Sequence, residues 1–177
     1  MFTTPTPFPL TLAPSPGVTG APVPCPPPPP DSSTPTPETL AYSLTLPAAL
    51  ATPALARTCA RALLQAHGLE DLTAPAVQAI GELTATACRF TTHSTEIYLS
   101  LRYRDDALRI TVYDDHPTHT NPRLADHCQA RRRSQLRLLG CLVRTCAGNW
   151  GYAPAPPPTT GTRMWATLPH TPTYTAA

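Results

Sequence analysis

The chain has 177 residues, of which 25 are prolines; all 13 basic residues are arginines, and the formal net charge is +2. So small a charge predicts no strong attraction to nucleic acid or to a membrane surface. No stretch approaches about 18 consecutive apolar residues, so no membrane-spanning helix is expected. The first residues, Met1–Pro5, lack the basic and apolar regions of a secretory signal. We therefore expect a cytoplasmic protein.

Proline is concentrated at the start of the chain, where 14 of the 25 precede Glu38. Proline lacks a backbone N–H and fixes φ, and few large apolar residues accompany it here. We expect residues 1–38 to form a disordered or polyproline-like Pro/Thr-rich tail, and residues 171–177 to be a short disordered tail. Residues 39–170 remain, about 130 in all, enough for one domain with its own core.

The domain is predicted to begin with a strand and two helices. Ser43–Pro47 alternates in polarity and ends at proline, which indicates a short edge strand. Ala54–His67 carries one apolar stripe at helical spacing, and Gly68 is a natural helix end. A second helix is expected to begin at Thr73, whose hydroxyl would cap it, with Pro75 in its first turn.

Two strands of a hairpin are predicted next. Apolar residues alternate from Ile97 to Tyr103 and again from Leu108 to Val112, and Asp105-Asp106 makes the turn between them. Such alternation places one face of the hairpin on a core.

The following segment, His116–Arg133, has no clear period and is predicted to be a long loop with a short helix near Leu124–Gln129. Ser134 is expected to cap a helix that ends at Gly148. Two further strands are predicted around Trp150 and Met164–Leu168. This order favours an α/β (α+β) two-layer sandwich, with a mixed, mostly antiparallel sheet and helices on one face.

The cysteines and histidines predict no disulfide framework and no metal centre. No C-x-x-C pair occurs, and four of the six cysteines lie among apolar or helix-forming residues, where small buried side chains are expected: Cys59, Cys88, Cys141 and Cys146. His116, His119, His127 and Cys128 lie close in the sequence, but their spacing matches no zinc-ligand pattern.

Four stretches together resemble a known family. They are Ala56-Arg57, Gly81–Phe90, Leu108–Asp114, and the segment from Leu142-Val143 through Asn149-Trp150-Gly151 to Gly161–Leu168. In this order they resemble the ATP-binding domains of the GHKL type, closest to the bacterial anti-sigma-factor serine/threonine kinases. The resemblance covers about 125 residues, from Leu44 to Leu168, and rests on the order of the motifs more than on any one of them.

The resemblance implies roles for three residues. Glu82 matches the general base that activates the attacking hydroxyl, and Thr86, one helical turn later, stands where the family has a Mg²⁺-binding Asn. Asp114 matches the residue that binds the adenine amine, and its position in the strand predicts that its side chain faces inward. From the residues alone, Glu82 could be a solvated helix residue and Asp114 part of an exposed turn. Two residues on, His116 replaces a small residue and is expected to crowd the adenine pocket.

The phosphate side of the implied site departs from the family pattern. Arg137–Leu139 align with a glycine turn, and Gly140 lies one residue later, so backbone N–H groups have lost their close approach to phosphate. Arg137, or one residue of the run Arg131–Arg133, could bind phosphate instead, although such a run is often only solvated. Thr162 stands where Lys is common, and Thr167 is the last of the implied nucleotide-binding residues.

Three functions follow as hypotheses. The first is an ATP- and Mg²⁺-binding regulator that phosphorylates or sequesters a partner, either a sigma factor or the antagonist protein that releases it; a homodimer is possible within this family. The second is a catalytically inactive protein–protein interaction module with the same fold. The third is a scaffold whose proline-rich tail binds partner domains.

Overall fold

The computed structural model describes residues 34–91 and 96–170. Residues 1–33 of the expected N-terminal tail, and the whole expected C-terminal tail, lie outside the described residues. The 3-10 turn η1 (Pro37–Thr39) precedes the first strand, and Leu40 beside it is buried. The folded part therefore begins slightly before the predicted boundary at residue 39.

The sheet has five strands in the order β1-β2-β3-β5-β4, and all four pairings are antiparallel. The strands are β1 (Ala41–Pro47), β2 (Glu96–Arg104), β3 (Ala107–Asp114), β4 (Asn149–Pro154) and β5 (Thr162–Pro169). The turn between β2 and β3 places Asp105 and Asp106 at positive φ, as two-residue hairpin turns of type I′ require.

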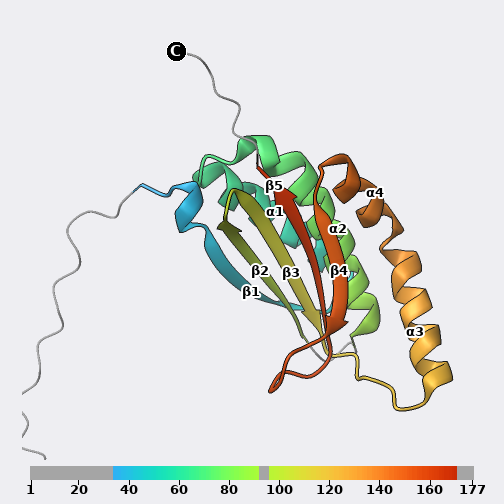
Figure 1. Cartoon of the computed structure of the whole chain (residues 1–177). Coiled ribbons are helices and arrows are strands. Elements are labelled where there is room, and N and C mark those ends of the chain that lie inside the picture. Colours follow the sequence, from blue (N-terminus) through green and yellow to red (C-terminus); the bar gives the residue numbers. More distant parts are fainter. Residues whose placement is uncertain (1–33, 92–95, 171–177) are drawn as a thin grey trace, which may run out of the picture. The chain divides into compact units, whose positions relative to one another are not determined.

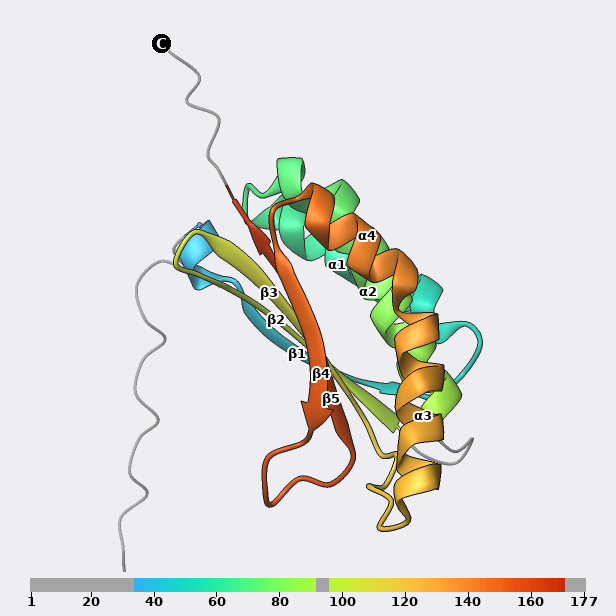
Figure 2. The same cartoon turned by 45° about the vertical axis from the view of Figure 1, so that its right-hand side comes forward.

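Helices cover one face of this sheet, so the predicted two-layer α+β sandwich is confirmed (Figures 1 and 2). They are α1 (Thr52–Ala66), α2 (Thr73–Phe90), α3 (Pro122–Gln135) and α4 (Arg137–Thr145). The helix α2 lies between α1 and α4 and packs on the central strand β3. Among the described residues, no helix is both long enough and apolar enough to cross a membrane.

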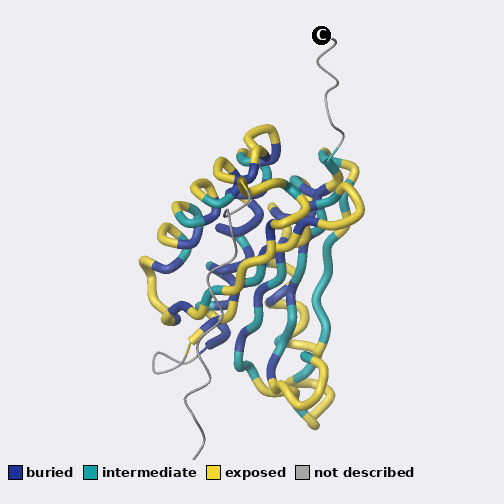
Figure 3. The backbone as a smooth tube through the Cα atoms, turned by 90° about the vertical axis from the view of Figure 1, so that its left-hand side faces the viewer, coloured by how far each residue is buried: buried dark blue, intermediate teal, exposed yellow. Residues whose placement is uncertain are grey.

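The core lies between the two layers, where the buried segments of strands and helices face one another (Figure 3). Alternate residues of the central strands point into it, as the sequence predicts: Ile97, Leu99 and Leu101 from β2, Leu108, Ile110 and Val112 from β3, and Met164, Ala166 and Leu168 from β5. The other face of the sheet is not covered by any described helix. It carries the register partners Tyr98 and Tyr113, and Trp165, whose register partner on β3 is Thr111.

Three local predictions are wrong. The segment after β3 is not mainly a loop, because residues 122–135 form the full helix α3, with the Asn121 side chain capping it and Pro122 in its first turn. Ser134 lies inside α3 and caps nothing; α4 starts after a break at Leu136. The Thr73 hydroxyl donates to the Leu69 carbonyl at 3.3 Å instead of capping α2.

Candidate functional site

Asp114 is the last residue of β3 and lies inside the fold. It is 3% exposed, so its predicted inward phase is confirmed. Thr162, the first residue of β5, is its register partner. Gly161, just before Thr162, has φ +96°, and a Cβ there would meet the Asp114 carbonyl oxygen. Only glycine allows the two strand ends to lie this close.

The partner of Asp114 is Arg132, from α3. The Arg132 Nη1 atom lies 2.5 Å from Oδ2 of Asp114, and Nη2 lies 3.5 Å from Oδ1. Nη2 also donates to the Thr162 hydroxyl at 3.3 Å, and Nη1 lies 3.2 Å from the Met164 sulfur. The guanidinium therefore reaches four atoms on the ends of β3 and β5.

Arg132 is as deeply buried as its partner. It is 3% exposed, and its guanidinium carbon lies 3.9 Å from the centre of the Phe90 ring at the end of α2. A guanidinium over an aromatic face gains cation–π attraction, more so where water is excluded. Burial raises the pKa of Asp114, whereas the hydrogen bonds and charge of Arg132 oppose that rise. The pair is thus a buried, hydrogen-bonded unit with Phe90 as its cover.

Arg132 is the only buried residue of α3. This helix extends past the end of α2 and beside the segment that follows β3 (Figures 1 and 2). Its neighbours Arg131 and Arg133 are exposed, and its apolar residue Leu124 is 47% exposed. The attachment of α3 to the rest of the fold therefore depends on a charged side chain more than on an apolar stripe.

A cavity of about 260 Å³ opens beside the ion pair. Its walls come from the segment after β3, from α3 and from the ends of β4 and β5, and they include Arg132 and Thr162. Three further lining residues form a close group at one end: His116, His119 and Cys128. Burial lowers the pKa of His116, and the nearby charge of Arg132 lowers it further.

Glu82 and Thr86 lie on α2 as expected, but in different surroundings. Glu82 is half-buried, and the Gln78 amide donates to its carboxylate at 3.3 Å along the exposed side of the helix. Thr86 is 2% exposed and is therefore enclosed by the packed layers. A metal ion with several water ligands needs more open space than a fully enclosed hydroxyl offers.

The two residues expected near the phosphates, Arg137 and Gly140, both lie on α4. Arg137 is exposed at the start of α4. Gly140 is buried one turn later, and a Cβ on it would lie 3.0 Å from the indole ring of Trp150 on β4. Its role in this structure is close packing of α4 on β4, and neither residue is brought next to Asp114.

Thr167 also lies away from Asp114. Its register partners are Arg109 on β3 and Asn149 on β4, both of which are exposed. Residues an odd number apart on a strand point to opposite faces, and Met164, Ala166 and Leu168 occupy the core face. Thr167 is therefore on the uncovered face of the sheet, whereas Asp114 is on the helical side.

The cysteine prediction holds in part. Cys59, Cys88 and Cys146 are partly buried, but Cys141 is exposed on α4, so the expected burial of Cys141 is wrong. The sequence offers no reason to connect Arg132 with Asp114, and the linear spacing of His116, His119 and Cys128 matches no zinc-ligand pattern, so the sequence does not predict that they meet. A helix over 122–135 would have supplied that reason, because it places Cys128 and Arg132 one turn apart on one face.

No model of a known protein family matches the chain. No curated protein sequence matches it either.

Proposed function

We propose that the chain is a regulatory protein that acts by binding a partner protein, and that Arg132 holds its adenine site closed. The resemblance to anti-sigma-factor kinases suggests a sigma factor or its antagonist as the partner. The observation that carries the proposal is the buried contact between Arg132 and Asp114. The guanidinium offers Asp114 the same kind of N–H donors that an adenine amine would offer, so the two compete for one carboxylate.

Two further observations favour partner binding over phosphate transfer. Arg137 and Gly140 do not form a phosphate-binding turn near Asp114, and Thr86 is enclosed. Without those contacts a triphosphate loses several charge-assisted hydrogen bonds, each worth about 1.5–3 kcal/mol.

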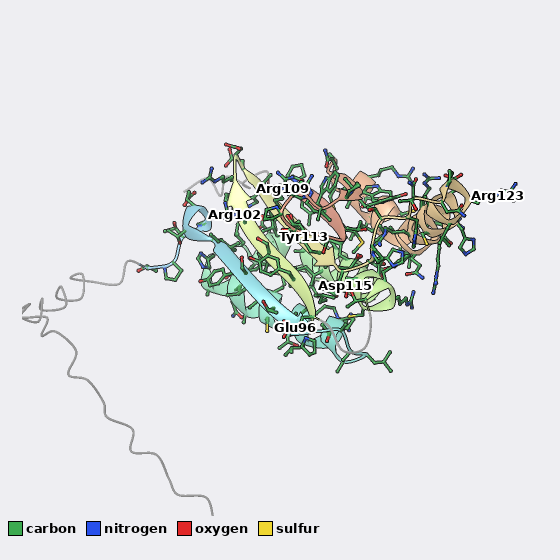
Figure 4. All side chains as sticks on the ribbon, turned by 90° about the horizontal axis from the view of Figure 1, so that it is seen from below. Glu96, Arg102, Arg109, Tyr113, Asp115 and Arg123 are labelled. Carbon is green, nitrogen blue, oxygen red and sulfur yellow. The ribbon has the colours of Figure 1, made fainter. Side chains whose placement is uncertain are left out.

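The uncovered face of the sheet offers a surface for the partner. Tyr98 and Tyr113 pack edge to face there, and Arg163 lies 5.0 Å from the Trp165 ring centre. Arg102 and Arg109 are register partners on β2 and β3, four residues along these strands from the pair Tyr98 and Tyr113 (Figure 4). Tyr, Trp and Arg are the residues most enriched among those that dominate binding energy at protein interfaces. The arginines favour an acidic partner surface.

The closed site is tested by calorimetric titration of the full chain with Mg²⁺-ATP. We expect no heat at millimolar ATP for the wild type and measurable binding for Arg132→Ala, with Arg133→Ala as the matched control. Tight ATP binding by the wild type, unchanged in Arg132→Ala, would contradict the proposal.

Partner binding is tested by capturing the host's sigma factors and their antagonists, each purified, on the immobilised chain. We expect capture to be the same with and without Mg²⁺-ATP and to fall at least about tenfold in Arg102→Glu/Arg109→Glu. If no member of either group binds, the role in sigma regulation is wrong.

An ATP-dependent serine/threonine kinase is the second candidate. Glu82 favours it, because this carboxylate remains half-buried on α2 with only Gln78 as its hydrogen-bond partner among the described residues. Phosphate transfer from ATP to an antagonist protein, abolished by Glu82→Gln, would support the kinase and count against the closed site.

A further inference from the structure

We infer that His116, His119 and Cys128 form a binding site for Zn²⁺ or a similar transition-metal ion, with one coordination position open to the cavity. His116 and His119 lie in the segment between β3 and α3, and Cys128 lies on α3 itself. Their donor atoms all lie within 4.8 Å of one another. This inference does not depend on the proposed function.

Two of the three distances between the donor atoms are close to those around a tetrahedral ion, and the third, between His116 and Cys128, is within 4.8 Å. The Nε2 atoms of His116 and His119 are 3.0 Å apart, and the Cys128 Sγ atom is 3.2 Å from the His119 Nε2. Zinc bonds of about 2.0–2.1 Å to nitrogen and about 2.3 Å to sulfur place two such donors roughly 3.3–3.6 Å apart. A bound ion therefore requires side-chain shifts of only a few tenths of an ångström on these two edges.

Hydrogen bonding alone does not satisfy this group. The His119 Nε2 has both the His116 Nε2 and the Cys128 Sγ at contact distance. A ring nitrogen carries either one hydrogen or one lone pair, so it makes one full hydrogen bond and not two. A metal ion accepts one lone pair from each of the three atoms at once. Three donor atoms directed at one point suit a metal site, whereas a hydrogen bond joins only two of them.

The surroundings suit a metal with an exchangeable ligand. All three residues are partly buried, so the ion would be held away from bulk water yet reached from the cavity. The Phe90 ring packs edge to face against the His116 ring, with ring centres 5.1 Å apart, and limits the tilt of the imidazole. Asp114 offsets part of the nearby Arg132 charge. Two imidazoles and a thiolate bind Zn²⁺ in preference to Mg²⁺ or Ca²⁺.

Zinc binding by the reduced full chain can be measured by competition with a chromophoric chelator. We expect one zinc ion per chain, and a loss of affinity of at least about 100-fold in Cys128→Ser and in His119→Ala. His127→Ala and Cys141→Ser are the matched controls, because both residues are exposed and neither belongs to the group. Both controls should keep the wild-type affinity.

Cobalt provides a second readout. Co²⁺ added to the full chain should give the visible bands of a tetrahedral site and a thiolate-to-cobalt charge-transfer band. That band should be absent in Cys128→Ser and present in His127→Ala. His116→Gln is a milder change. It should weaken metal binding while circular dichroism shows that the fold is retained. No stoichiometric zinc at micromolar concentration would overturn the inference. So would zinc binding that survives Cys128→Ser and His119→Ala.

Discussion

Asp114 and Arg132 are each buried because the other is. Replacing Arg132 by Ala leaves a buried carboxylate without its charged partner, which typically costs about 3–5 kcal/mol. We expect the lower end, about 3 kcal/mol, because Arg132 lines the adjoining cavity, and its truncation would open a path for water to Asp114. Urea unfolding followed by circular dichroism measures the loss.

Two comparisons isolate the ion pair from a general effect of substitution. Arg133→Ala, at an exposed neighbour, should change the unfolding free energy by no more than about 0.5 kcal/mol. The double change Arg132→Met/Asp114→Leu removes both charges and should recover most of the stability. Equal effects of Arg132→Ala and Arg133→Ala would show that the buried pair does not stabilise the fold.

Gly140 tests the packing of α4 on β4. An alanine there gains about 1 kcal/mol of helix propensity, but its Cβ would lie 3.0 Å from the Trp150 ring. Overpacking of this kind costs about 1–3 kcal/mol, so we expect Gly140→Ala to be neutral or destabilising by up to about 2 kcal/mol, measured by thermal unfolding. In a Trp150→Leu background the clash is absent, and the same change should become stabilising.

At the level of single residues, the sequence predicts that Asp114 is buried but not which residue is its ion-pair partner. The alternation Leu108, Ile110, Val112 carries Asp114 to the inner face, which the structure confirms. Its partner lies 18 residues away within a run of three arginines, and only the helical geometry of α3 selects the middle one. The functional roles that the resemblance implies for Glu82, Thr86, Asp114, Arg137, Gly140 and Thr167 stay predictions.

Among the elements, α3 should be the least firmly held. It contributes one buried residue, whereas α2 contributes ten. Local opening free energies follow buried contacts, so amide hydrogen exchange should be faster in α3 than in α2. Arg132→Ala should speed exchange in α3 further and leave α1 and α2 nearly unchanged, as read by mass spectrometry of peptic fragments. Uniform acceleration in all helices would instead indicate global destabilisation.

The sequence does not predict α3 as a helix, and the cause is physical. Hydrophobic periodicity reveals a helix by its apolar stripe, and α3 has none, because it docks through Arg132. The other three helices each bury apolar residues at helical spacing, and the sequence predicts each of them. The end signals Asn121 and Pro122 were present, but without a periodic stripe they pointed equally well to a turn.

For the whole molecule, the two faces of the sheet should respond differently to substitution. Ile110 is fully buried on the helical side, whereas Thr111, its neighbour on β3, is half-buried on the uncovered side. Ile110→Ala should cost about 2–5 kcal/mol, and Thr111→Ala about 0.5 kcal/mol or less, in urea unfolding. Similar costs at both positions would mean that another surface covers the sheet in solution. The two-layer architecture itself was predictable because strand alternation and helix stripes agree on one core.

The buried Arg132 also determines what fraction of the molecules has α3 moved away from Asp114. Any ligand that needs Asp114 binds only the molecules in which α3 has moved away, so its apparent dissociation constant rises by the inverse of that fraction. If docking of α3 were worth, for example, about 3 kcal/mol, roughly one molecule in 160 would be open. A ligand that binds the open form at micromolar concentration would then require roughly a hundred times more in solution. A partner protein that holds α3 outward would remove that penalty, and by reciprocity the ligand would tighten the partner's binding.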